Sequence, residues 1–87
     1  MTKQITGSSV HGKSGIPATY VAEYRTGLAG IYYSATVVLE GCPPSRQSGF
    51  MVWSRKHFPP GRAVERTVRD SIQFLDVAAL LAKRDRA

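Results

Sequence analysis

The sequence has one cysteine, Cys42, and no long apolar run. A single cysteine excludes a disulfide framework or a cysteine-based zinc cluster within the chain, and it favours a reducing compartment. No stretch approaches the roughly 20 apolar residues of a membrane-spanning helix, and the N-terminus lacks the apolar run of a signal peptide. We therefore expect a cytoplasmic protein that is not inserted in a membrane.

Acidic residues are also scarce. The 87 residues contain six Asp and Glu against twelve Lys and Arg, which gives a net charge of +6 at neutral pH. Such an excess favours anionic partners, namely nucleic acid, acidic proteins or membrane surfaces. The length corresponds to one domain with a modest core, and at this size a second subunit often supplies missing burial.

The sequence also shows no recognisable set of catalytic or metal-ligating residues. The six carboxylates are scattered and mostly stand beside arginines, which is the pattern of balanced surface charge. Cys42 precedes two prolines in a predicted loop, and neither His11 nor His57 has a third residue that would complete a nucleophile and base. We expect no enzymatic activity, no catalytic residue, no metal site and no cofactor.

One phosphate-binding motif is present letter for letter. Residues 7–14, GSSVHGKS, match the P-loop pattern, in which glycines wrap phosphates, Lys13 reaches the outer phosphates and Ser14 meets magnesium. That chemistry requires a strand before the loop and a helix after it, whereas Gly15 and Pro17 stand where the helix would begin. We therefore predict that no nucleotide binds here, and that residues 1–16 form a flexible polar arm before a single domain at residues 17–87.

Three runs have the composition of strands. Residues 18–25 (ATYVAEYR) alternate with a period of two, and residues 31–40 (IYYSATVVLE) are rich in β-branched and aromatic side chains. Glycines flank the short segment between them, which is typical of a hairpin. After a predicted loop at residues 41–49, residues 50–58 (FMVWSRKHF) are predicted to form the third strand.

From about Pro60 the apolar period becomes helical and continues to the C-terminus. Val64, Val68, Ile72 and Leu75 form a stripe that should pack on the sheet. The predicted fold is therefore α+β, with a three-stranded antiparallel sheet packed by one long C-terminal helix (β-β-β-α) and a flexible N-terminal arm.

Two basic surfaces follow from this fold. On the helix, three arginines lie roughly opposite the apolar stripe, where they form either a phosphate-binding stripe or a solvated face. On the sheet, the register of the third strand is fixed only to within one residue, and a slip exchanges its two faces. If Phe50 and Val52 face the helix, the outer face combines cations with aromatic rings, which suits phosphates and bases; alternatively, Trp53 belongs to the core. The candidate nucleic-acid-binding residues are Arg25, Tyr32, Trp53, Arg55, Lys56, Arg62, Arg66 and Arg69.

The second half of the predicted helix is apolar nearly all round, so one three-stranded sheet cannot cover it. Either the N-terminal arm or a second subunit must do so, and we predict a symmetric homodimer. The predicted interface consists of Phe74, Val77, Leu80 and Leu81.

Two hypotheses of function remain. The first is a small nucleic-acid-binding module, possibly a DNA-binding accessory or regulatory factor, which the clustering of cations in residues 46–69 favours. The second is a protein-interaction module that self-associates through the C-terminal helix and has no nucleic-acid role.

Overall fold

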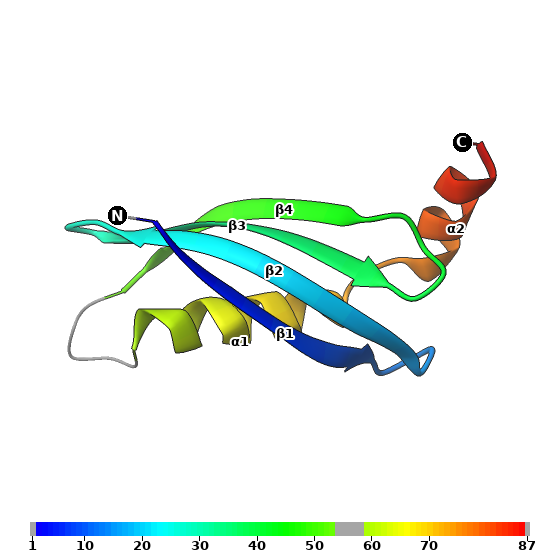
Figure 1. Cartoon of the computed structure of the whole chain (residues 1–87), viewed down its shortest axis with the longest axis horizontal. Helices are drawn as coiled ribbons and strands as arrows, with labels where there is room; N and C mark the ends of the chain where they lie inside the picture. The colour runs from blue at the N-terminus through cyan, green and yellow to red at the C-terminus, as the bar shows by residue number, and fades with distance from the viewer. Residues whose placement is uncertain (1, 54–58, 87) are drawn as a thin grey trace.

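Alternating side chains in the first part of the chain build one antiparallel sheet (Figure 1). The computed structural model describes residues 2–53 and 59–86. Within these residues the strands are β1 (Lys3–His11), β2 (Ile16–Thr26), β3 (Gly30–Leu39) and β4 (Ser45–Val52), and the helices are α1 (Pro60–Ile72) and α2 (Val77–Arg86). The strands lie in the order β1-β2-β3-β4, so each pairs with its neighbour in the sequence. The sheet therefore has four strands in the described residues, and the predicted three-stranded sheet is wrong.

The N-terminal segment is an edge strand, which contradicts the predicted flexible arm. β1 pairs with β2 from Lys3, opposite Tyr24, to His11, opposite Ile16. Its central residue is glycine because a large side chain from β2 fills the space beside it: a Cβ atom added to Gly7 would collide with the hydroxyl of Tyr20. Gly7, Ser8 and Ser9 interrupt the β-branched residues of this strand, Ile5, Thr6 and Val10, so the composition by which strands are recognised is not continuous.

The C-terminal region forms two helices and not one long helix. α1 ends at Ile72, and the backbone N–H groups of Gln73 and Phe74 bond three residues back, to Asp70 and Ser71. The carboxylate of Asp76 then accepts a hydrogen bond of 3.1 Å from the backbone N–H of Ala79, which is the geometry of a helix N-cap. The break contains neither Pro nor Gly, so the sequence pattern did not reveal it.

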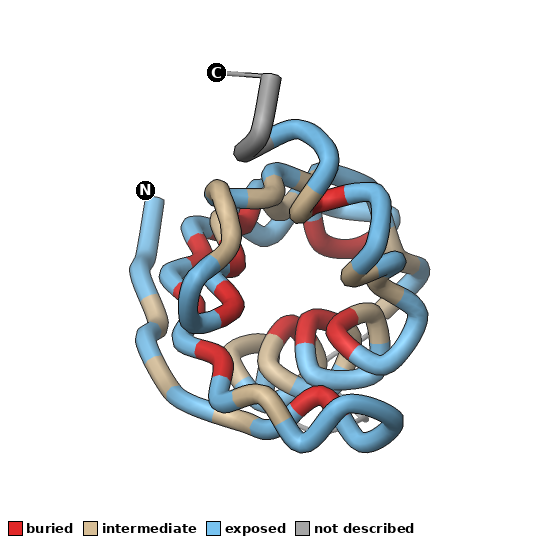
Figure 2. Tube along the Cα trace, turned by 90° about the vertical axis from the view of Figure 1, so that its right-hand side faces the viewer, coloured by how far each residue is buried: buried red, intermediate tan, exposed pale blue. Residues whose placement is uncertain are grey.

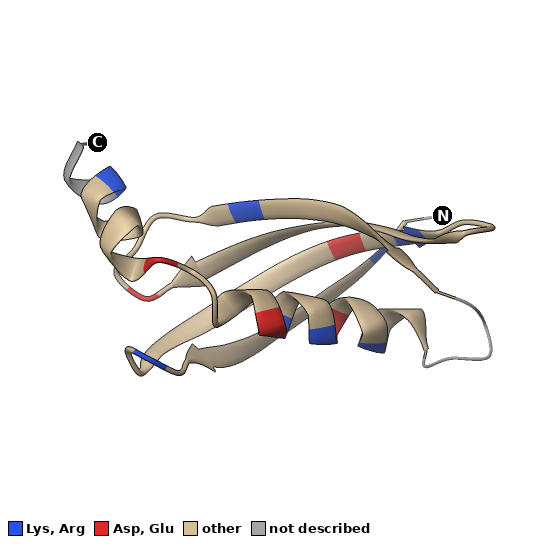
Figure 3. Cartoon of the chain, turned by 180° about the vertical axis from the view of Figure 1, so that it is seen from behind, with Lys and Arg blue, Asp and Glu red and all other residues tan. Residues whose placement is uncertain are grey.

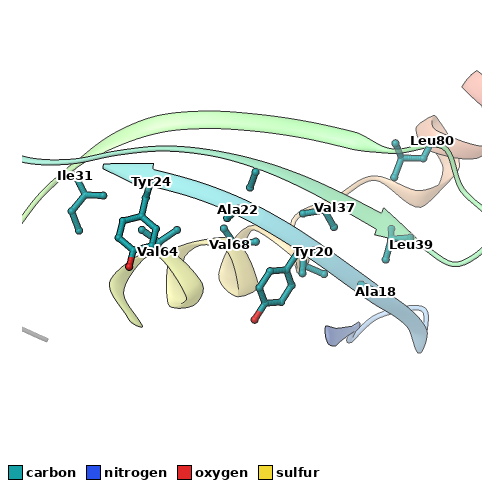
Figure 4. Packing of buried hydrophobic residues seen from close by; sticks show 12 residues of the cluster. Ala18, Tyr20, Ala22, Tyr24, Ile31, Val37, Leu39, Val64, Val68 and Leu80 are labelled. Atoms are coloured by element: carbon teal, nitrogen blue, oxygen red, sulfur yellow. The ribbon is translucent and has the colours of Figure 1, made fainter. Parts of the chain in front are cut away.

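The core lies between α1 and one face of the sheet (Figures 2 and 4). Val64, Val68 and Ile72 are fully buried, as the predicted stripe required, whereas Leu75 is only partly buried. The sheet contributes Ala18, Tyr20, Ala22, Tyr24, Ile31, Ala35, Val37 and Leu39. Burial of one larger side chain in such a core stabilises the fold by about 1.5 to 3 kcal/mol. α1 packs on β1, β2 and β3, so it lies nearer one edge of the sheet than the other.

Candidate nucleic-acid interface

The face of the sheet opposite α1 carries no described helix, and its side chains are open to solvent (Figure 1). Hydroxyl groups and valines dominate its centre. The described hydroxyl residues on this face are Thr6, Ser8, Thr19, Ser34, Thr36 and Ser48. We call this surface the outer face.

β4 adopts the second of the two possible registers, in which the side chains predicted to face the helix lie on the opposite face of the sheet. β4 begins at Ser45, earlier than the predicted third strand, and its pairing places Met51 opposite the fully buried Ile31. Phe50 and Val52 therefore point to the outer face, whereas Met51 and Trp53 pack against the core. Trp53 consequently does not belong to the outer face, contrary to the predicted binding surface.

The outer face carries a row of three side chains across three neighbouring strands. Arg25 of β2 lies opposite Tyr32 of β3, which lies opposite Phe50 of β4. The two ring centroids are 4.8 Å apart with their planes tilted by 50°, and the guanidinium carbon of Arg25 is 5.0 Å from the centroid of Tyr32. Tyr32 is 49% exposed and Phe50 is 45% exposed, so about half of each ring faces solvent. We call these residues the aromatic row.

A small hollow adjoins the aromatic row. It has a volume of about 210 Å³, and its lining includes Glu23, Arg25, Tyr32 and Ser34. The other described cation on the outer face is Arg46, on β4. The face therefore offers aromatic surface, hydroxyl groups and two cations, with Glu23 as an acidic neighbour.

The predicted arginine stripe, Arg62, Arg66 and Arg69, lies on α1 (Figure 3). Arg69 is engaged within the fold: its Nε donates to the Tyr20 hydroxyl and its Nη2 donates to the Ser8 carbonyl, both at 3.2 Å. The hydrogen bond to Tyr20 is the main cause that raises the pKa of Arg69 above its ordinary value, and Glu65, 3.7 Å away, adds to it.

Arg62 and Arg66 have a different environment from Arg69. Both are exposed, and neither guanidinium group has a hydrogen-bond or ion-pair partner among the described residues. They lie beside a groove of about 410 Å³ that is also lined by Glu65, Arg69 and Asp70. The stripe therefore consists of two free cations and one structural one, interleaved with acidic residues.

The two predicted basic surfaces are not neighbours. The aromatic row and the exposed side of α1 are separated by the sheet, the core and the helix itself. Arg55 and Lys56, which also belong to the predicted binding residues, lie outside the described residues. One short ligand therefore meets either the outer face or the helix arginines, but not both.

The residues of the predicted dimer interface have separate roles. Leu80 is buried in the chain's own core and Val77 packs against that core, whereas Phe74 is 87% exposed. Leu81 is half-buried. The structure thus leaves Phe74 as the most exposed of the four.

The P-loop-like residues form part of β1 and a hairpin. β2, and not a helix, follows the turn, so the expectation that no helix starts there is confirmed. The backbone N–H of Gly12 donates to the side chain of Gln73 at 2.7 Å. The buried ring of His11 has its Nδ1 2.7 Å from the Ser14 hydroxyl and its Nε2 3.1 Å from the Leu75 carbonyl. Sequence reasoning considered His11 only as a base and missed that it links the hairpin to the segment before α2.

Comparison with known proteins gave no match to a protein-family model, a curated protein or a solved structure. Among the described residues, no helix is long and apolar enough to cross a membrane. In the same part of the chain, no three His, Cys, Asp or Glu side chains gather as a metal site would require.

Proposed function

We propose that this protein binds single-stranded nucleic acid on the outer face of its sheet. The observation that carries the proposal is the aromatic row, in which Tyr32 and Phe50 are half-exposed on an uncovered sheet beside Arg25. An exposed pair of aromatic rings in contact with a cation is a surface on which bases stack, whatever their sequence.

The chemistry of the outer face distinguishes single strands from duplexes. In a duplex the faces of the bases are stacked on each other, so Tyr32 and Phe50 cannot reach them. In a single strand one base can stack on each ring, while Arg25 and Arg46 meet the phosphates and the hydroxyl groups bond to phosphate or sugar. The proposal therefore expects tighter binding to an unpaired oligonucleotide than to the same length of duplex.

Fluorescence anisotropy with a labelled oligothymidine tests the proposal. Because each stacked base contributes about 1 to 3 kcal/mol, Tyr32→Ala and Phe50→Ala should each weaken binding by about 5-fold to 150-fold. Phe74→Ala is the matched control, since it removes an equally large and more exposed ring that lies outside the outer face. Equal affinities of the Phe50→Ala and Phe74→Ala variants would refute the proposal.

The alternative function, a protein-interaction module, has one structural observation in its favour. The two edges of the sheet are unequally protected, and the β4 edge is open among the described residues. An open edge is a surface on which protein strands pair.

A further inference from the structure

The edge of the sheet at β1 is capped by side chains from α1. Nη2 of Arg69 donates to the Ser8 carbonyl at 3.2 Å, and Nε2 of Gln73 donates to the Val10 carbonyl at 2.8 Å. Two residues along a strand span about 6.6 Å, and four residues along a helix rise about 6 Å, so side chains one helical turn apart match alternate carbonyls of the strand. These carbonyls are no longer available to another strand.

The edge at β4 has no such protection. Among the described residues, the hydrogen bonds of the β4 backbone are those of its ladder with β3. The side chain of Gln47 bonds to the Ser71 hydroxyl at 2.6 Å, but this contact holds the inner face of β4 and leaves its edge open. β4 contains neither Pro nor Lys, and Arg46 is its only charged residue. Apart from Arg46, it therefore lacks the usual features that prevent edge strands from pairing.

We propose that β4 pairs antiparallel with β4 of a second copy of the chain, about a two-fold axis perpendicular to the sheet. The two sheets would then become one continuous sheet, with α1 of each copy on the same side. Because the β1 edges are capped, the assembly closes as a dimer and does not grow into a fibre.

The side chains of β4 favour a register in which Gly49 lies opposite Gly49 of the second copy. A two-fold axis of this kind pairs residues of the same face, so Ser48 lies opposite Phe50 and Arg46 lies opposite Val52. The two Arg46 side chains are thereby kept apart, which avoids the cost of like charges directly opposite each other. Gly49 also brings no side chain to the axis, and Tyr33 of the same chain fills the space where its Cβ atom would stand, with the hydroxyl 3.1 Å from that position.

This register would join the aromatic rows of the two copies. Phe50 of one copy is the diagonal neighbour of Phe50 of the other, a distance that aromatic side chains can bridge. The outer face would then carry one aromatic surface running from Tyr32 of one copy to Tyr32 of the other. The dimer itself does not depend on the proposed nucleic-acid binding, and it is tested without nucleic acid.

Sedimentation equilibrium over a wide range of protein concentration tests this dimer with two matched variants. Ser48→Lys adds a charge to the outer face of the β4 edge, and Ser8→Lys makes the same change on the outer face of the capped β1 edge; both serines are exposed. We expect the wild type and Ser8→Lys to dimerise with similar dissociation constants. The dissociation constant of Ser48→Lys should be at least tenfold higher than that of the wild type. Phe74→Asp should leave the dimer intact.

Three results would overturn the proposal. If the wild-type chain stays monomeric at every concentration, the dimer is wrong, and the β4 edge would instead be available to an extended segment of another protein. Dissociation by Phe74→Asp, with no effect of Ser48→Lys, would place the dimer at α2. Equal effects of Ser8→Lys and Ser48→Lys would show that the two edges do not differ as proposed. Circular dichroism that matches the wild type ensures that each variant is folded, and a Ser48→Thr variant should retain the dimer.

Discussion

At the scale of single residues, the motif that resembles a P-loop has a structural explanation. Gly7 makes room for Tyr20, whose buried hydroxyl accepts a hydrogen bond from Arg69. Gly12 and Ser14 contact Gln73 and His11. The glycines and the serine of the motif therefore serve the packing of β1 and its hairpin against the rest of the fold.

The close contact between Gly7 and Tyr20 predicts a large effect of a small substitution. Gly7→Val would force Tyr20 from its position, and overpacking of this kind typically costs about 1 to 3 kcal/mol in the free energy of unfolding. Ser8→Val is the control, because Ser8 is exposed and valine favours strands, so it should change stability by about 0.5 kcal/mol at most. Urea denaturation measures both, and similar stabilities for the two variants would contradict the packing role of Gly7.

His11 predicts a local effect on α2. Since Nε2 lies 3.1 Å from a carbonyl, it must donate, and Nδ1 then accepts from Ser14. His11→Ala leaves the Leu75 carbonyl without this donor, which should cost about 1 to 3 kcal/mol. Hydrogen exchange should become faster in α2 than in the β2–β3 hairpin, whereas the exposed Lys13→Ala control should leave α2 unchanged. Uniformly faster exchange throughout the sheet would show that His11 does not act locally.

At the scale of elements, the sequence predicted β2 and β3 well because their own side chains build the core. Tyr20, Ala22 and Tyr24 alternate with exposed residues, which is the pattern that the structure shows as buried and exposed. β1 and the first half of β4 were missed because Gly7, Ser8 and Ser9 interrupt the first and polar residues make up the second. Pairing with a neighbouring strand decides the conformation of both segments.

The candidate site was predicted in part for the same reason. Arg25 and Tyr32 belong to the strongly patterned strands, and they lie together on the outer face. Trp53 faces the core and Phe50 faces solvent, the reverse of the predicted arrangement. The register of β4 is set by its ladder with β3 and not by its own sequence. The predicted binding residues followed the register that turns Trp53 outward, and they therefore omitted Phe50, which completes the aromatic row.

The capping of β1 by α1 predicts what happens when the cap is removed. Arg69→Ala with Gln73→Ala frees the carbonyls of Ser8 and Val10 and also removes the bonds of these side chains to the Tyr20 hydroxyl and the Gly12 N–H. Four lost hydrogen bonds should lower the free energy of unfolding by about 2 to 6 kcal/mol. A chain with two open edges should also form larger assemblies, measured by light scattering at increasing concentration. The control, Arg62→Ala with Arg66→Ala, removes two exposed cations one turn apart on the same helix and should do neither. Unchanged assembly in the first variant would show that the cap does not protect the edge.

At the scale of the whole molecule, the separation of its two basic surfaces governs how binding should respond to salt. The sheet, the core and α1 lie between the two surfaces, and exposed charges are largely screened beyond roughly 8 Å at physiological ionic strength. Charges on the exposed side of α1 are therefore largely screened from a strand bound on the outer face. Net charge alone does not predict which surface binds.

Binding on the outer face should accordingly show a shallow dependence on salt. Each phosphate neutralised on a single strand contributes a slope of about −0.7 in log affinity against log salt, so Arg25 and Arg46 together give about −1.4. Arg46→Ala should reduce the magnitude of the slope by about 0.7. Arg62→Ala with Arg66→Ala removes two of the same charges from α1 and should leave the slope unchanged. Anisotropy titrations at several salt concentrations measure the slope for the wild type and for both variants. If only Arg62→Ala with Arg66→Ala reduces the magnitude of the slope, the binding surface is on α1 and not on the outer face.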